Sequence, residues 1–103
     1  MKNPNPLEKD IERRICDYAK SKGCLVYKFT SPSRRSVPDR LFITLKGEVF
    51  FAEFKRLGCK PTAAQVEEIG KIKRQGVPVF IIDAVDAGKT MVDAMVRPTV
   101  IDF

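Results

Sequence analysis

The chain has 103 residues, of which 44% are hydrophobic and 31% charged, enough for one small domain with a single core. Nineteen basic against thirteen acidic residues give a net charge of +6, which favours a polyanionic partner such as nucleic acid. The absence of histidine excludes Ser-His-Asp and Cys-His catalysis and histidine-bound zinc, and no apolar run is long enough to span a membrane.

A helix is expected over residues 7–22, because apolar side chains recur there at helical spacing and Gly23 follows. The later elements expected along the chain are a strand at 24–29, a loop at 30–38, strands at 40–44 and 48–54, a helix from Pro61-Thr62 to about Gln75, a strand at 77–82 and a helix at 84–95. Segment 97–103 is assigned to no element.

The order α-β-β-β-α-β-α predicts an α/β fold with a central mixed sheet flanked by helices, in a single domain over 1–103. The first three strands are expected to be antiparallel neighbours, and the last to join after a helical crossover. Three widely spaced cysteines without a Cys-x-x-Cys pair predict reduced thiols, and hence a cytoplasmic location.

The turn between strands 40–44 and 48–54 decides where Asp39 lies. A two-residue turn at Lys46-Gly47 places Asp39 and Glu53 on opposite faces, whereas a three-residue turn at 45–47 places them directly opposite each other. We prefer the three-residue turn, because it puts Gly47 where a left-handed residue is needed.

In that register the Cβ atoms of Asp39 and Glu53 are about 5 Å apart, with Lys55 on the same face. A divalent cation such as Mg²⁺ or Mn²⁺ relieves the repulsion between the two carboxylates, and Lys55 orients a water or stabilises developing charge during phosphodiester hydrolysis. The structural alternative is a salt-bridged surface patch between Lys55 and either acid.

Three separated motifs occur in order: residues 30–40 (TSPSRRSVPDR), 51–55 (FAEFK) and 60–65 (KPTAAQ). With this spacing the chain resembles the VRR-NUC family, the virus-type replication-repair nucleases of the PD-(D/E)xK superfamily, from about Glu8 to Ile82. The resemblance implies the restriction-endonuclease-like fold. In its small size the chain looks like the stand-alone phage and bacterial members of the family. Those members are associated with cleaving Holliday junctions as homodimers.

Carried over residue by residue, the resemblance makes Asp39 and Glu53 metal ligands, Lys55 the catalytic lysine and the backbone carbonyl of Phe54 a further ligand. Gln65 matches an active-site glutamine, although Thr62-x-x-Gln65 is also a capping box in which the glutamine only closes the helix start.

The family also uses a glutamate from the first helix. Glu12 is the better match and Glu8 the alternative, and a solvated helix face would explain either. The chain has Ser33 and Ser36 where relatives usually have glycines, which affects the geometry of the loop rather than the chemical residues.

Basic residues surround this acidic centre in the sequence and are expected to bind the DNA backbone by shape rather than base sequence: Lys28, Arg34, Arg35, Arg40, Arg56 and Lys60. Gly88-Lys89-Thr90 imitates the end of a phosphate-binding loop. The glycine which that loop requires is replaced by Asp83, so no nucleotide cofactor is expected.

The predicted function is therefore a Mg²⁺- or Mn²⁺-dependent endonuclease that resolves four-way DNA junctions as a homodimer in a bacterial or phage-infected cell. Apolar residues of 91–103 (Met91, Met95, Val100, Ile101 and Phe103) are candidates for the dimer interface. The alternatives are a non-catalytic basic DNA-binding module of the same fold, and a nuclease that cuts flaps or duplex without preference for junctions.

Overall fold

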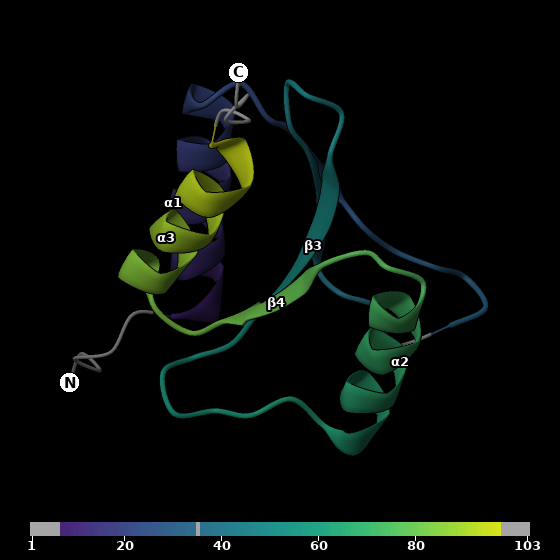
Figure 1. Cartoon of the computed structure of the whole chain (residues 1–103). Coiled ribbons are helices and arrows are strands. Elements are labelled where there is room, and N and C mark those ends of the chain that lie inside the picture. The colour runs from purple at the N-terminus through teal and green to yellow at the C-terminus, as the bar shows by residue number, and fades with distance from the viewer. Residues whose placement is uncertain (1–6, 35, 98–103) are drawn as a thin grey trace, which may run out of the picture.

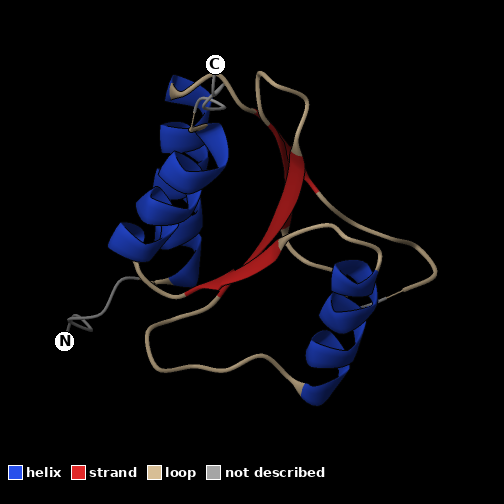
Figure 2. Cartoon of the chain, viewed as in Figure 1, coloured by secondary structure: helices blue, strands red, loops and turns tan. Residues whose placement is uncertain are grey.

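A computed structural model describes residues 7–34 and 36–97 and contains a four-stranded mixed sheet with helices on both faces (Figures 1 and 2). The elements, in chain order, are α1 (Glu8–Ser21), β1 (Leu25–Lys28), β2 (Arg40–Ile43), β3 (Val49–Phe54), α2 (Ala63–Arg74), β4 (Val79–Ile82) and α3 (Val85–Val96). The strand order is β1-β2-β3-β4, in which the first three strands are antiparallel and β4 runs parallel to β3. The predicted fold class and element order are confirmed.

The β2–β3 hairpin has the three-residue turn that the sequence favoured. Arg40 pairs with Ala52, which brings Asp39 level with Glu53. Gly47 takes a φ of +82°, and the Thr44 amide donates to the carbonyl of Glu48 at 2.9 Å. Because side chains alternate along a strand, Asp39, Glu53 and Lys55 share one face, as predicted.

The larger core lies between the sheet and the pair α1 and α3. Phe42, Phe50 and Phe54 are fully buried there against Ile11 and Ile15. The rings of Phe42 and Phe50 stack 4.7 Å apart. Since burying each such side chain contributes about 1.5–3 kcal/mol, this layer fixes the sheet against α1.

Helix α2 covers the opposite face more thinly. Its one buried residue among those described is Ile69, which packs with Phe51 and Val79. A full capping box between Thr62 and Gln65 fixes its first turn. Helix α2 therefore depends on its capped start, as well as on this small cluster, for its position.

Three smaller predictions have outcomes here. Met91 is wrong as an interface candidate, because it is 4% exposed and lies in the core, and Met95 packs against that core. The candidates Val100, Ile101 and Phe103 lie outside the described residues.

The three cysteines are free thiols. No helix within 7–34 and 36–97 is both long and apolar enough to cross a membrane.

Gly88 lies inside α3 and not in a phosphate-binding loop before a helix. Close packing explains why this position is a glycine. A Cβ at this position would overlap the buried side chain of Ile15 and approach Ile82 Cγ2 to 3.2 Å. Helices α1 and α3 thus pack closely together at Gly88, where a side chain is missing.

We predict that Gly88→Ala lowers the melting temperature, because the overlap with Ile15 outweighs the gain of about 1 kcal/mol in helix propensity. Gly70→Ala in α2 is the matched control. Its added Cβ meets only the flexible end of Arg74 at 3.3 Å, so the melting temperature should rise. Thermal unfolding followed by circular dichroism measures both, and an equal rise in the two variants would refute the packing argument.

Candidate active site

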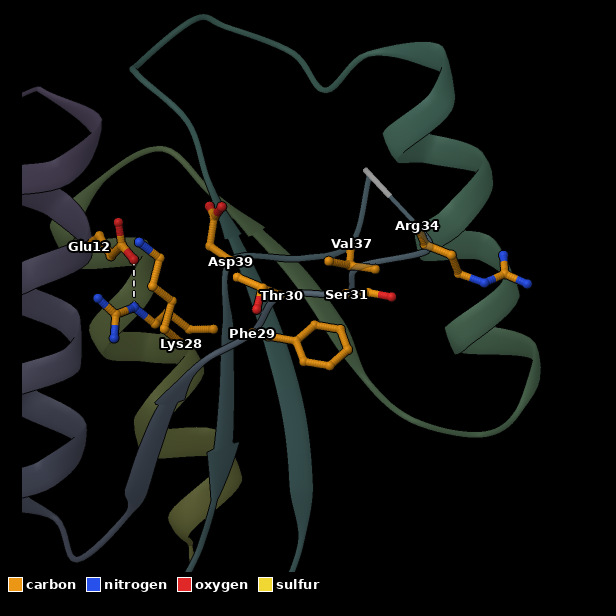
Figure 3. Close-up of a pocket in the computed structure, with 9 residues that line it drawn as sticks. Glu12, Lys28, Phe29, Thr30, Ser31, Arg34, Val37 and Asp39 are labelled. Carbon is orange, nitrogen blue, oxygen red and sulfur yellow. Dashed lines mark hydrogen bonds and ion pairs between the residues drawn. The ribbon is translucent and has the colours of Figure 1, made fainter.

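The carboxylate of Asp39 is anchored to the neighbouring strand at the site end of the hairpin. Its Oδ2 accepts a hydrogen bond of 2.8 Å from the backbone amide of Phe54, and the amide of Phe29 donates to the Asp39 carbonyl at 2.9 Å. Backbone on both sides therefore holds Asp39, and its side chain projects at the edge where β2 begins (Figure 3).

Glu53 lies opposite on β3 and is 2% exposed, almost removed from water. Its Oε2 is 3.4 Å from Lys55 Nζ. The Lys55 side chain is itself only 15% exposed, and its backbone amide donates to Ile82 on β4 at 2.9 Å. The predicted triad of Asp39, Glu53 and Lys55 is thus brought together, with Glu53 buried and the other two residues partly buried.

Gln65 makes the contacts that each of its two predicted roles requires. Its Oε1 accepts from the Thr62 amide at 2.9 Å and closes the capping box. Its Nε2 donates to Glu53 Oε2, also at 2.9 Å. One side chain therefore caps the start of α2 and also hydrogen-bonds Glu53, so the start of this helix is coupled to the acidic centre.

Glu53 Oε1, in contrast, is buried without a hydrogen-bond partner. Burial, reinforced by the charge of Asp39 and opposed by Lys55, raises the pKa of Glu53 to about 7. Burial also raises the pKa of Asp39, against the hydrogen bond from Phe54. An unpartnered acidic oxygen beside a second carboxylate is the donor set that a hard divalent cation prefers, so these residues fit the predicted metal.

Among the described residues no three His, Cys, Asp or Glu side chains form a ready cage. A cation held by Asp39 and Glu53 would therefore complete its coordination with a backbone carbonyl, such as that of Phe54, and water. Partial hydration of this kind is usual for Mg²⁺.

Helix α1 brings two further carboxylates towards this edge of the sheet. Glu12, preferred from the sequence, accepts from Arg40 Nε at 2.6 Å and is thereby neutralised. Burial, followed by the charge of Asp39, raises the pKa of Glu8, and Lys55 opposes the shift. The charges of Asp39 and Lys55 thus act on Glu8, whereas Glu12 is the glutamate held by an arginine.

The basic residues divide into distinct groups. Lys28, Arg34 and Arg40 line one cavity together with Asp39 (Figure 3), whereas Arg56 lies beside Glu8 and Glu12. Lys60 is exposed on the connection before α2, and Arg35 lies outside the described residues. Arg34 binds Glu68 of α2 at 2.8 Å, a pairing across 34 positions that no local pattern in the sequence signals.

Comparison with known proteins finds a related nuclease and a shared fold. No family model matches the sequence. The chain is 38% identical over 79 residues, 77% of its length and 85% of the relative's, to a protein described as "Putative nuclease p44" from Acyrthosiphon pisum secondary endosymbiont phage 1. A solved structure described as "VRR_NUC domain" superposes with a TM-score of 0.78 over 84% of this chain and 94% of that one, at 24% identity, which indicates a shared fold.

The raised pKa of Glu53 predicts how stability depends on pH. Folded Glu53 keeps its proton up to a pH of about 7, whereas the unfolded chain releases it near 4.5. The folded state therefore binds more protons in this window, and the free energy of unfolding of the metal-free protein should fall as pH rises from about 4.5 to about 7. The loss should be on the order of 3 kcal/mol.

Glu53→Gln removes the titrating group and should flatten this dependence. Urea unfolding at a series of pH values in EDTA measures it. A slope that is the same in wild type and Glu53→Gln would show that Glu53 ionises normally.

Proposed function

Because the chain belongs to the VRR-NUC nuclease family, we propose that it is a Mg²⁺- or Mn²⁺-dependent endonuclease that cuts branched DNA. Its proposed substrate is the four-way junction, and its proposed active form is a homodimer. The observation that carries the proposal is the facing pair of Asp39 and buried Glu53, with Glu53 Oε1 left unpartnered. Two facing carboxylates destabilise a small domain, and a bound cation would explain why the fold keeps them together.

Each residue of the centre has a distinct task in phosphodiester hydrolysis. Asp39, Glu53 and the Phe54 carbonyl would hold the cation, which supplies Lewis-acid polarisation of the phosphate and the attacking water. Gln65 restrains Glu53 Oε2, which leaves Oε1 available to the cation. Lys55, 3.4 Å from Glu53, offers an ammonium group to the charge that develops on the phosphoryl oxygens.

The net charge of +6 supports DNA as the substrate. A four-way junction presents two strands for symmetric incision, and a two-fold dimer would supply two equivalent sites. β1 is an edge strand of the sheet, and its Leu25 and Tyr27 are 55% and 52% exposed. An open strand edge with exposed apolar side chains favours pairing with a second copy of the chain.

The cleavage prediction uses an end-labelled four-way junction beside a matched linear duplex, with Mg²⁺, Mn²⁺ or EDTA. Wild type should make paired symmetric cuts in the junction, and both Asp39→Ala and EDTA should abolish them, by at least about a hundredfold. A thermal shift with Mg²⁺ in wild type but not in Asp39→Ala would report cation binding independently of turnover.

Other results would redirect the proposal. Binding without cleavage in either metal would favour the non-catalytic DNA-binding module. Equal cutting of duplex, flap and junction would favour a nuclease without preference for junctions.

The dimer prediction is tested by gel filtration with light scattering. Wild type should have a mass near twice 11.6 kDa. Tyr27→Lys should shift the protein towards monomer, because it places a charge at the strand edge. Leu57→Lys is the control, a residue 52% exposed on the connection after β3 that should leave the mass unchanged. A wild-type monomer at working concentration would contradict the dimer.

A further inference from the structure

A cavity of about 430 Å³ adjoins the acidic centre, between the end of β1, the following loop and the start of β2 (Figure 3). Asp39 forms part of its wall. Whatever occupies the cavity therefore lies next to the phosphate that the proposed nuclease cuts. The volume falls in the range of about 300–1,000 Å³ typical of small-molecule sites, well beyond the space a single phosphate group requires.

The two ends of the cavity differ in chemistry. Figure 3 shows Lys28 extending on the side of Glu12, whereas the Phe29 ring lies on the side of Val37. The Phe29 ring packs against Phe51 with centroids 5.0 Å apart, which fixes its orientation. Thr30 adds a hydroxyl group to the wall. The cavity thus offers a cation at one end and an aromatic surface at the other.

The charges of the lining favour a phosphate at the Lys28 end. Arg40 and Arg34 also line the cavity, but Glu12 and Glu68 neutralise them. Within the described part of the chain, Lys28 is the lining cation that no carboxylate holds. An incoming phosphate can pair with Lys28 without first breaking an ion pair of the protein.

We propose that this cavity is a nucleotide-binding pocket that accepts one unpaired nucleotide next to the scissile bond, with its phosphate on Lys28 and its base against Phe29. Bases stacked within a duplex cannot enter a pocket, whereas an unpaired or extruded base can, and aromatic rings bind such bases by stacking. The inference rests on the proposed nuclease function and deepens it, because it makes a base that is unpaired or extruded at the branch point the feature that selects the substrate.

The test measures binding in EDTA, so that neither metal nor cleavage contributes. Fluorescence anisotropy compares three labelled DNAs: a fully paired duplex, the same duplex with one bulged nucleotide, and the same bulge with an abasic residue. Wild type should bind the bulged duplex about tenfold more tightly than the paired one, and loss of the base should remove the gain.

Two variants tie the preference to the cavity. Thr30→Trp should fill it and abolish the preference for the bulge, whereas Thr90→Trp, the same change at an exposed position of α3, should keep it. Phe29→Leu retains apolar volume against Phe51 but lacks the ring, and should reduce the preference several-fold. Circular dichroism checks that each variant is folded.

Equal affinity for paired and bulged DNA, a preference that survives removal of the base, or a preference that survives Thr30→Trp would each overturn the pocket. These outcomes are separable from failure of the nuclease proposal, which is decided by metal-dependent cleavage. A protein that cuts junctions but binds bulged and paired DNA equally would keep the proposed function and lose the pocket.

Discussion

The burial of the Glu53 carboxyl group opposite Asp39 is the constraint on which the rest of the site depends. The hairpin register forces the two carboxylates to face each other, and the burial of Glu53 removes the water that would screen them. The neighbouring polar groups then contact one or the other of these two carboxylates. The Phe54 amide binds one carboxylate, Lys55 and Gln65 bind the other, and one oxygen of Glu53 remains unpartnered. A centre that is incompletely satisfied in this way is the arrangement expected where a cation completes the structure.

The rigidity of the centre comes mainly from the other face of the sheet. Phe42, Phe50 and Phe54 alternate with the site residues along β2 and β3 and lock the strands against α1 and α3. Helix α2 is held more lightly, by Ile69 and by its capped start. Because Gln65 belongs to that start, a movement of α2 would change the hydrogen bond to Glu53. The position of the helix therefore bears directly on the acidic centre.

Much of the positive charge near the site is already paired in the free protein. Arg40 is bound to Glu12 and Arg34 to Glu68, so the basic rim expected from the sequence is weaker than a count of its arginines suggests. These pairs also perform structural tasks, since one joins α1 to β2 and the other joins the loop before β2 to α2. Partly exposed ion pairs of this kind contribute modestly to stability, and phosphate groups can compete for them.

The sequence by itself determined the fold class, the element order and the shared face of Asp39, Glu53 and Lys55. Those features follow from local periodicity and from Gly47, whose positive φ selects the turn and hence the register. The sequence also indicated two roles for Gln65, although it could not choose between them. Only the tertiary structure decided that Glu12 pairs with Arg40, that Arg34 pairs with Glu68, that Met91 is buried and that a cavity adjoins Asp39. Each of these depends on contacts between residues far apart in the chain, and a repeating local pattern carries no information about which distant side chain will be met.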